Sequence, residues 1–283
     1  MQLTFIKQYY FTITLALILL QFCDAIPVEE DLTLTLKERV ALDSFRKEVG
    51  HLLPHDYMQE DIYLIRWLRA KNLDIEAAKT MLTNNLKWRE EYKVDTILEE
   101  DFSYFVKRFP FWLDGRDKDD RPIGSADIAI WDPRRIVIAG RALELYRYAI
   151  SVLEFASKLV RADQAAGRNV TQFTLIANLD GFNLIQHACV QCLPFYVQFL
   201  IVYENHFPGM LHKFFMVNTS PAFETLLRIA RPVLTKSTTD TWSIHGTNKR
   251  HWTEAIREVI EPDQIRPQFG GTKMDVEDID NFY

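Results

Sequence analysis

Residues 204–246 read ENHFPGMLHKFFMVNTSPAFETLLRIARPVLTKSTTDTWSIHG, and this stretch decides the fold. A turn at 207–209 leads into the apolar run 214–217, whose length and composition predict a buried strand. Ser220 and Pro221 are typical of a helix N-cap followed by the first helical residue. A strand followed by a helix is therefore expected here.

The helix expected over 221–231 is amphipathic, and a second short strand is expected at 242–246. Its apolar positions, which share one face at i, i+3, i+4 and i+7, are Phe223, Leu226, Leu227 and Ala230. A crossover helix that covers a sheet needs such a face, and so does a lid that closes an apolar cavity. The pattern alone favours the crossover helix, and the lid stays open as the second interpretation.

The rest of the chain predicts a small helical bundle followed by an α/β domain. Helices are expected over 34–49, over 61–70 and from Asp74, which is a suitable N-cap. A long helix is expected over 141–159. The strands, which alternate with helices and so predict a mainly parallel sheet, are expected near 125–131, 172–179, 213–218 and 242–246.

Residues 184–203 carry no charged side chain over a length that could span a bilayer. A polar stripe at helical spacing nevertheless runs through them, formed by His187, Gln191, Pro194 and Gln198. A bilayer span does not need such a stripe. This segment is therefore predicted to be a largely buried helix of a globular domain. Cys189 and Cys192 within it are predicted to be buried core thiols, with a redox-active C-x-x-C pair as the alternative.

Several spaced motifs resemble the CRAL-TRIO lipid-binding family, which contains phosphatidylinositol/phosphatidylcholine transfer proteins and tocopherol- and retinal-binding proteins. The motifs are HFPGMLHKFFMVN (206–218), SPAFETLLRIARPVL (220–234), WSIHG (242–246) and IEPDQIRPQFGGT (260–272). Residues 61–98 resemble the family's N-terminal helical domain, and KRFPFWLDGRDKDDRPI (107–123) resembles the entry to its lipid domain.

The resemblance covers about residues 34–274 and implies a non-catalytic lipid carrier with a mobile gate helix. The expected divisions are a signal peptide at 1–25, a helical domain at 34–95, a lipid-binding domain at 100–274 and an acidic tail at 275–283. The expected partners are a hydrophobic lipid and, transiently, a membrane surface, with the protein itself a monomer. A phospholipid transfer protein and a scaffold that uses the same fold are the alternatives.

The resemblance also indicates which positions would hold a phospholipid headgroup. The inositol-phosphate positions fall on Lys71, Gly209, Thr238 and Thr241, so that only Lys71 and Thr238 keep a suitable side chain. The phosphatidylcholine positions fall on Leu113, Gly124, Phe173, Leu175 and Tyr203, and most of these lack a hydroxyl. We therefore expect an apolar cavity that takes a retinoid, a tocopherol or another isoprenoid rather than a phospholipid. The residues predicted to contact the ligand are Leu113, Phe173, Leu175, Ala177, Phe195, Phe199, Tyr203, Phe215, Val217, Phe223 and Leu227.

No catalytic residue, metal site or cofactor is predicted. The chain contains no G-x-S-x-G, P-loop, H-E-x-x-H or G-x-G-x-x-G motif, and its seven histidines show no metal-ligand spacing. An unrecognised hydrolase stays a remote alternative. The net charge of −6 argues against a nucleic-acid partner that is held by bulk charge.

The N-terminus predicts entry into the secretory pathway. Residues 11–20 form an apolar core of signal-peptide length, and Cys23 and Ala25 place small residues at the cleavage-setting positions, so cleavage is expected after Ala25. An uncleaved anchor or a cytoplasmic protein is the alternative. Two glycosylation sequons begin at Asn169 and Asn218, and the first falls in an expected loop.

Overall fold

The computed structural model describes residues 31–274, so the predicted signal peptide (1–25) and acidic tail (275–283) lie outside the described residues. The first part of the chain is a helical unit formed by α3 (Leu36–Val49), α4 (Asp61–Ala70) and α5 (Ile75–Glu91). The short helices that follow or join them are η1 (Gly50–Leu52), η2 (Asp56–Gln59), η3 (Val94–Glu99) and α6 (Ser103–Val106).

Local sequence explains where the helices of this unit begin. Thr35 and Glu38 form a capping box at the start of α3, and Asp74 caps α5 by accepting a hydrogen bond from the main-chain N–H of Ala77. The helices pack around apolar side chains with no exposed surface, among them Phe45 and Leu68. Burial of these faces supplies most of the stability of such short helices.

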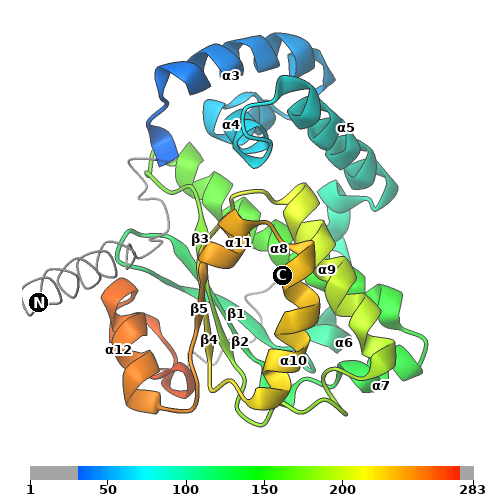
Figure 1. Cartoon of the computed structure of the whole chain (residues 1–283), viewed down its shortest axis with the longest axis vertical. Helices are drawn as coiled ribbons and strands as arrows, with labels where there is room; N and C mark the ends of the chain where they lie inside the picture. The colour runs from blue at the N-terminus through cyan, green and yellow to red at the C-terminus, as the bar shows by residue number, and fades with distance from the viewer. Residues whose placement is uncertain (1–30, 275–283) are drawn as a thin grey trace, which may run out of the picture.

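The second part of the chain is built on a five-stranded sheet in the order β1-β2-β3-β4-β5 (Figure 1). Strand β1 (Phe111–Arg116) pairs antiparallel with β2 (Pro122–Asp127), whereas β3 (Phe173–Asn178), β4 (Leu211–Val217) and β5 (Trp242–Ile244) continue the sheet in parallel. The predicted mixed α/β fold with a mainly parallel sheet is confirmed.

Two strand predictions differ from the structure. Strand β1 was not expected, because its second half, Asp114 to Arg116, belongs to a charged run that is typical of a solvated turn. The strand expected at 125–131 is displaced toward the N-terminus, since Ile128–Ile130 form the short helix η4.

Helices cover both faces of the sheet. The remaining helices are α7 (Pro133–Ile138), α8 (Ala142–Ala165), η5 (Val190–Cys192), α9 (Leu193–His206), α10 (Pro221–Ala230), η6 (Arg231–Val233), α11 (Lys236–Asp240), α12 (Lys249–Val259), η7 (Pro262–Gln264) and η8 (Pro267–Phe269). In Figure 1, α8, α9 and α10 lie on one side of the sheet and α12 lies on the other.

The prediction for 184–203 was wrong in three respects. The helix α9 begins only at Leu193, with Pro194 in its first turn, where a main-chain N–H has no partner within the helix and proline is therefore tolerated. The helix is also not largely buried, since only Val202 and Tyr203 of α9 are buried. In addition, Cys189 and Cys192 form a disulfide instead of two core thiols. Within residues 31–274, no helix is both long and apolar enough to cross a bilayer.

Candidate functional site

A cavity of about 240 Å³ lies between the sheet and the helices α8, α9 and α10. Its walls come from residues between Phe109 and Trp242, which are far apart in sequence and are brought together by the sheet. The lining residues are Phe109, Phe111, Ala126, Ile128, Trp131, Pro133, Leu145, Tyr148, Ala149, Val152, Leu175, Ile176, Ala177, Leu179, Phe182, Phe195, Tyr196, Phe199, Leu200, Phe214, Met216, Phe223, Leu226, Leu227, Ala230 and Trp242.

None of these lining residues is charged, and their hydroxyl groups belong to Tyr148 and Tyr196. The hydroxyl of Tyr148 donates a 2.8 Å hydrogen bond to the main-chain oxygen of Phe109, and that of Tyr196 donates a 2.5 Å hydrogen bond to the main-chain oxygen of His187. Burial raises the pKa of Tyr196, which keeps its hydroxyl neutral. Both protons are therefore engaged with the protein, and the cavity offers a ligand almost purely apolar contacts.

The parallel strands β3 and β4 form the floor of the cavity. Leu175 and Ala177 of β3, which were both predicted to contact the ligand, line the cavity. On β4, however, Phe214 and Met216 line the cavity. The predicted residues Phe215 and Val217 point to the opposite face, where they pack with α12. The prediction chose the wrong alternate residues of β4, because successive strand side chains point to opposite faces.

The other predicted ligand contacts divide in the same manner. Phe195 and Phe199 of α9 line the cavity, as do Phe223 and Leu227 of α10. In contrast, three predicted residues do not line it but pack into the adjoining core, namely Leu113, Phe173 and Tyr203. Tyr203 has a structural task there, since its hydroxyl oxygen accepts a 3.1 Å hydrogen bond from the main-chain N–H of Leu211.

Helix α8 contributes a wall that was not among the predicted site residues. Its lining side chains are Leu145, Tyr148, Ala149 and Val152. Their spacing of i, i+3, i+4 and i+7 is the same one-face pattern that drew attention to α10. The signal was present in the sequence, but an apolar helix face that packs on a core looks identical to one that lines a cavity.

Gly124 shows why one polar anchor cannot be present. A Cβ atom at this position would lie 2.5 Å from the ring of Phe111 and 2.7 Å from the side chain of Leu175. Contacts this short do not occur for real Cβ atoms, so a serine would not fit without a shift of both neighbours. The corner of the cavity at this position is closed by carbon atoms.

Helix α10 forms the remaining wall with its apolar stripe. Phe223, Leu226, Leu227 and Ala230 are buried on the cavity side, whereas Arg228 and Ile229 are exposed on the other. The stripe predicted from the sequence packs on sheet residues such as Met216 and also lines the cavity, and α10 connects the parallel strands β4 and β5 as a crossover helix does.

The positions predicted for a phosphate headgroup lie away from this cavity. Neither Lys71, at the C-cap of α4, nor Thr238, in α11, is among the lining residues. The hydroxyl oxygen of Thr238 accepts a hydrogen bond from Thr235 at 3.3 Å. Gly209 closes a tight turn with φ +67°, a left-handed conformation that favours glycine.

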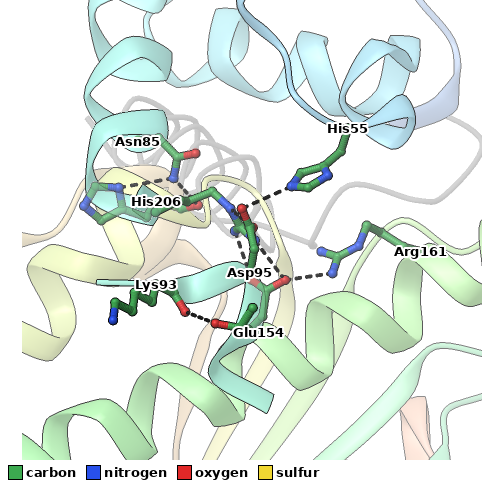
Figure 2. Close-up of polar contacts among 9 residues, drawn as sticks. His55, Asn85, Lys93, Asp95, Glu154, Arg161 and His206 are labelled. Atoms are coloured by element: carbon green, nitrogen blue, oxygen red, sulfur yellow. Dashed lines mark hydrogen bonds and ion pairs between the residues drawn. The ribbon is translucent and has the colours of Figure 1, made fainter. Parts of the chain in front are cut away.

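A polar cluster joins the helical unit to the part of the chain that contains the sheet (Figure 2). The Arg89 guanidinium on α5 donates to Glu154 on α8 at 3.0 Å, and Arg161 donates to the same carboxylate at 2.8 Å. The side chains of Arg89 and Glu154 are 8% and 5% exposed, so their charges need one another. Arg89 also pairs with Asp95, which accepts a contact from His55 at 3.1 Å.

His206 lies at the edge of this cluster and holds α9 against α5. Its ring stacks on Trp88 with centroids 3.9 Å apart, and its Nδ1 lies 3.2 Å from the side-chain nitrogen of Asn85. Burial, with a smaller contribution from the positive charge of Arg89, lowers the pKa of His206 to about 4. We assign this cluster a structural role, because both oxygens of its buried carboxylate are occupied by arginine donors. Within residues 31–274, no group of three or more acidic, histidine or cysteine side chains is arranged to hold a metal ion.

The domain is thus a mainly parallel sheet with an apolar cavity between the sheet and the ten-residue amphipathic helix α10. Residues 107–271 match the CRAL/TRIO domain, which is more than half of the chain. The chain therefore belongs to the CRAL/TRIO domain family, and the family resemblance seen in its sequence is confirmed.

Two curated relatives show the range of this similarity. The chain is 28% identical over 83% of its length to the SEC14 cytosolic factor of Kluyveromyces lactis and covers 78% of that protein. It is 26% identical over 82% of its length to the phosphatidylinositol/phosphatidylcholine transfer protein SFH7 of Arabidopsis thaliana, but it spans only 43% of that protein. Among solved structures, that of Sfh5 matches with a TM-score of 0.66 and 12% identity, covering 85% of this chain and 89% of the other, which supports the fold alone.

Proposed function

We propose that this protein binds one hydrophobic lipid in the cavity and transfers it between membranes without catalysing a reaction. The first support comes from two relatives, each of which is similar in sequence over more than four fifths of this chain. One of them is named a phosphatidylinositol/phosphatidylcholine transfer protein. The second support is the enclosed cavity, whose carbon lining removes an apolar ligand from water at a gain of roughly 25 cal/mol per Å².

We further propose a retinoid, a tocopherol or another isoprenoid as the ligand, in preference to a phospholipid. The observation that carries this choice is the engagement of both lining hydroxyls, those of Tyr148 and Tyr196, by main-chain oxygens. A phosphate or choline group in the cavity would lose water without gaining partners, which costs several kcal/mol. The volume of about 240 Å³ is also just below the roughly 300–1,000 Å³ of common ligand sites, which suits one slender molecule.

Phospholipid transfer is the second candidate, and the names of the relatives favour it. In that case the headgroup would have to stay outside the apolar walls, where Lys71 and Thr238 are available. A scaffold that binds no lipid is the third candidate. It differs from the other two in predicting no stoichiometric ligand.

We propose that helix α10 is the lid and that the rim beside it contacts the bilayer. Phe182 lies against Phe223 of the lid, and the segment that follows it carries two strongly exposed apolar side chains, Ile185 (73%) and Val190 (80%). Arg134 and Arg135 of α7 are exposed beside this segment. The main-chain N–H of Arg134 donates a hydrogen bond to the main-chain oxygen of Gln186, which belongs to the segment. Apolar side chains flanked by cations suit the surface of a membrane that contains anionic lipids.

We propose that the protein is secreted as a monomer. The signal-like N-terminus supports this, and so does the disulfide between Cys189 and Cys192, since disulfides persist mainly in oxidising compartments. Asn169 is exposed and open to glycosylation. Asn218, by contrast, is engaged on both sides of its amide, with Asn178 and with the Trp252 indole.

Ligand titration with a cavity-filling variant tests the proposal. Retinol, α-tocopherol, phosphatidylcholine and phosphatidylinositol would each be added to delipidated protein, and binding would be followed by quenching of tryptophan fluorescence. Ala149→Phe fills the cavity from α8, and Ala162→Phe adds the same ring to an exposed site on the same helix as the matched control. We expect tight binding of an isoprenoid that Ala149→Phe abolishes and Ala162→Phe preserves. Binding of phospholipids alone would favour the second candidate, and no binding at all would favour the scaffold.

A further inference from the structure

The disulfide between Cys189 and Cys192 lies directly before α9. It closes a loop of only four residues. Because a loop this short restricts the unfolded chain very little, the disulfide contributes little to stability through chain entropy. Stabilisation of the whole fold is therefore a poor explanation for its presence. Its position between two elements of the cavity wall suggests a local task.

The first of these elements is the turn 183–188, and the second is α9. The turn is held by main-chain hydrogen bonds from His187 to Asn183 at 3.0 Å and from Ala188 to Leu184 at 3.2 Å. Besides the disulfide, three hydrogen bonds connect this segment to α9. The hydroxyl of Tyr196 donates to the main-chain oxygen of His187, and the main-chain N–H groups of Cys192 and Leu193 donate to the main-chain oxygen of Cys189 at 2.7 and 3.2 Å. The extended backbone of Cys189 (ψ 153°) is the hinge between them.

The turn is in direct contact with the lid through aromatic rings. Phe182, which precedes the turn, stacks on His187 with centroids 5.1 Å apart. The same ring meets Phe223 of α10 edge to face at 5.3 Å. A change in the position of the turn is thus transmitted to the lid by one ring.

The two sulfur atoms differ in access. Cys192 is fully buried and is the N-cap residue of α9, whereas Cys189 is half-buried next to Val190, which is largely exposed. An incoming thiolate therefore reaches Cys189, and the sulfur of Cys192 leaves at the positive end of a 14-residue helix, which favours a thiolate.

We propose that Cys189 and Cys192 form a thiol–disulfide exchange site for a dithiol reductant and that its redox state sets how long the cavity retains its ligand. In the first step a reductant thiolate attacks Sγ of Cys189, the bond between the two cysteines breaks, and Cys192 leaves as a thiolate that takes up a proton. In the second step the other reductant thiolate attacks its own sulfur in the mixed disulfide and releases Cys189, which is also protonated. Two electrons and two protons pass from the dithiol to the protein.

Reduction leaves the hinge at Cys189 held by hydrogen bonds alone, so that the turn, Phe182 and the lid separate from α9 more often. The oxidised protein holds its ligand, and the reduced protein exchanges it rapidly. This inference rests on the proposed lipid-binding function, and the experiment below contains one measurement that does not depend on a ligand.

Hydrogen exchange of the lid amides (221–230) would be followed by mass spectrometry for the full chain with and without dithiothreitol. The double variant Cys189→Ser with Cys192→Ser is the matched control. We expect reduction to speed exchange in the lid about tenfold, the variant to exchange at the fast rate without reductant, and dithiothreitol to have no further effect on it. Reoxidation of the wild-type protein should restore slow exchange, which separates opening from unfolding. Unchanged lid exchange on reduction, or an equal response in the double-serine variant, overturns the proposal.

Release of bound retinol to phosphatidylcholine vesicles is the second measurement. A release rate that rises about tenfold on reduction, in the wild-type protein alone, supports control of ligand retention. Retinol release that is insensitive to reduction overturns it. If retinol does not bind, the proposed isoprenoid ligand is wrong, and lid exchange alone decides whether the disulfide controls the lid.

Discussion

The rings of Phe182 and Phe223 meet edge to face with centroids 5.3 Å apart, which links the loop before α9 to the helix that closes the cavity. Aromatic pairs in this geometry contribute about 0.5–1.5 kcal/mol beyond the area they bury. A contact of this size can hold a lid closed and still allow it to open. The proposed role of α10 as a lid and the cavity beside it lead to the following expectations.

The first prediction concerns the apolar stripe of the lid. The variant Phe223→Asp with Leu227→Asp removes two buried side chains, each worth roughly 1.5–3 kcal/mol, and should lower the rate of retinol transfer between vesicles at least tenfold. Ile229→Asp, on the exposed side of the same helix, is the control and should transfer at the wild-type rate. Thermal unfolding should remain cooperative in both. A double variant that is folded and transfers normally would mean that the ligand enters elsewhere, and one that cannot fold would make α10 a fixed crossover helix.

The second prediction concerns the engaged hydroxyl of Tyr148. Tyr148→Phe removes the hydrogen bond to the main-chain oxygen of Phe109 and should reduce the free energy of unfolding by about 1 kcal/mol. The affinity for retinol should change less than twofold, because the hydroxyl is not available to a ligand. Chemical denaturation and a binding titration measure the two effects separately. A large loss of affinity with no loss of stability would show that the hydroxyl serves the ligand.

The third prediction concerns the buried ion pair between the helical unit and α8. Glu154→Gln leaves the charges of Arg89 and Arg161 without their shared partner and should reduce the free energy of unfolding by roughly 3–5 kcal/mol. Glu144→Gln breaks the pair with Arg141, which is open to solvent, and should have a much smaller effect on the free energy of unfolding. Equal effects of the two changes in urea denaturation would contradict the structural role assigned to this cluster.

The fourth prediction concerns pH. Since the pKa of His206 falls from 6.5 to about 4 in the folded protein, the unfolded chain binds the proton more readily. The stability from neutral His206 should therefore be complete above pH 6.5 and should be lost progressively as the pH falls toward 4. The melting temperature should fall over the same pH range. Because the pKa of His212 is lowered as well, His206→Phe should remove only part of this fall in melting temperature. His51→Phe, at an exposed site, is the control. If the melting temperature falls equally with pH in the wild type, His206→Phe and His51→Phe, the assignment to His206 is refuted.

Much of the fold could be predicted from the sequence, because helix caps and apolar stripes in the sequence coincide with the helix ends and buried faces of the structure. Ser220 and Pro221 mark the start of α10, and the stripe behind them is the wall of the cavity. The interpretation as a crossover helix could not be separated from a lid, since both bury the same face. In the structure α10 connects the parallel strands β4 and β5 and also lines the cavity through Leu227, so the crossover role is present and the lid stays a proposal.

The site itself was less predictable than the fold. The run Phe214 to Val217 is apolar at every position, so no alternation indicates which side chains face the ligand. The disulfide was missed for a related reason: a C-x-x-C pair at helical spacing gives no sign that the chain is extended at Cys189. The first feature depends on α12, which is distant in sequence, and the second on the backbone path from the turn 183–188 into Cys189.

The central claim is that the cavity holds an apolar lipid with no headgroup inside its walls. Native mass spectrometry of the protein purified from a secretory eukaryotic host, followed by extraction and identification of the released molecule, tests it most directly. We predict one isoprenoid-type lipid per protein chain and no phospholipid. A phospholipid bound at one molecule per chain would contradict the account.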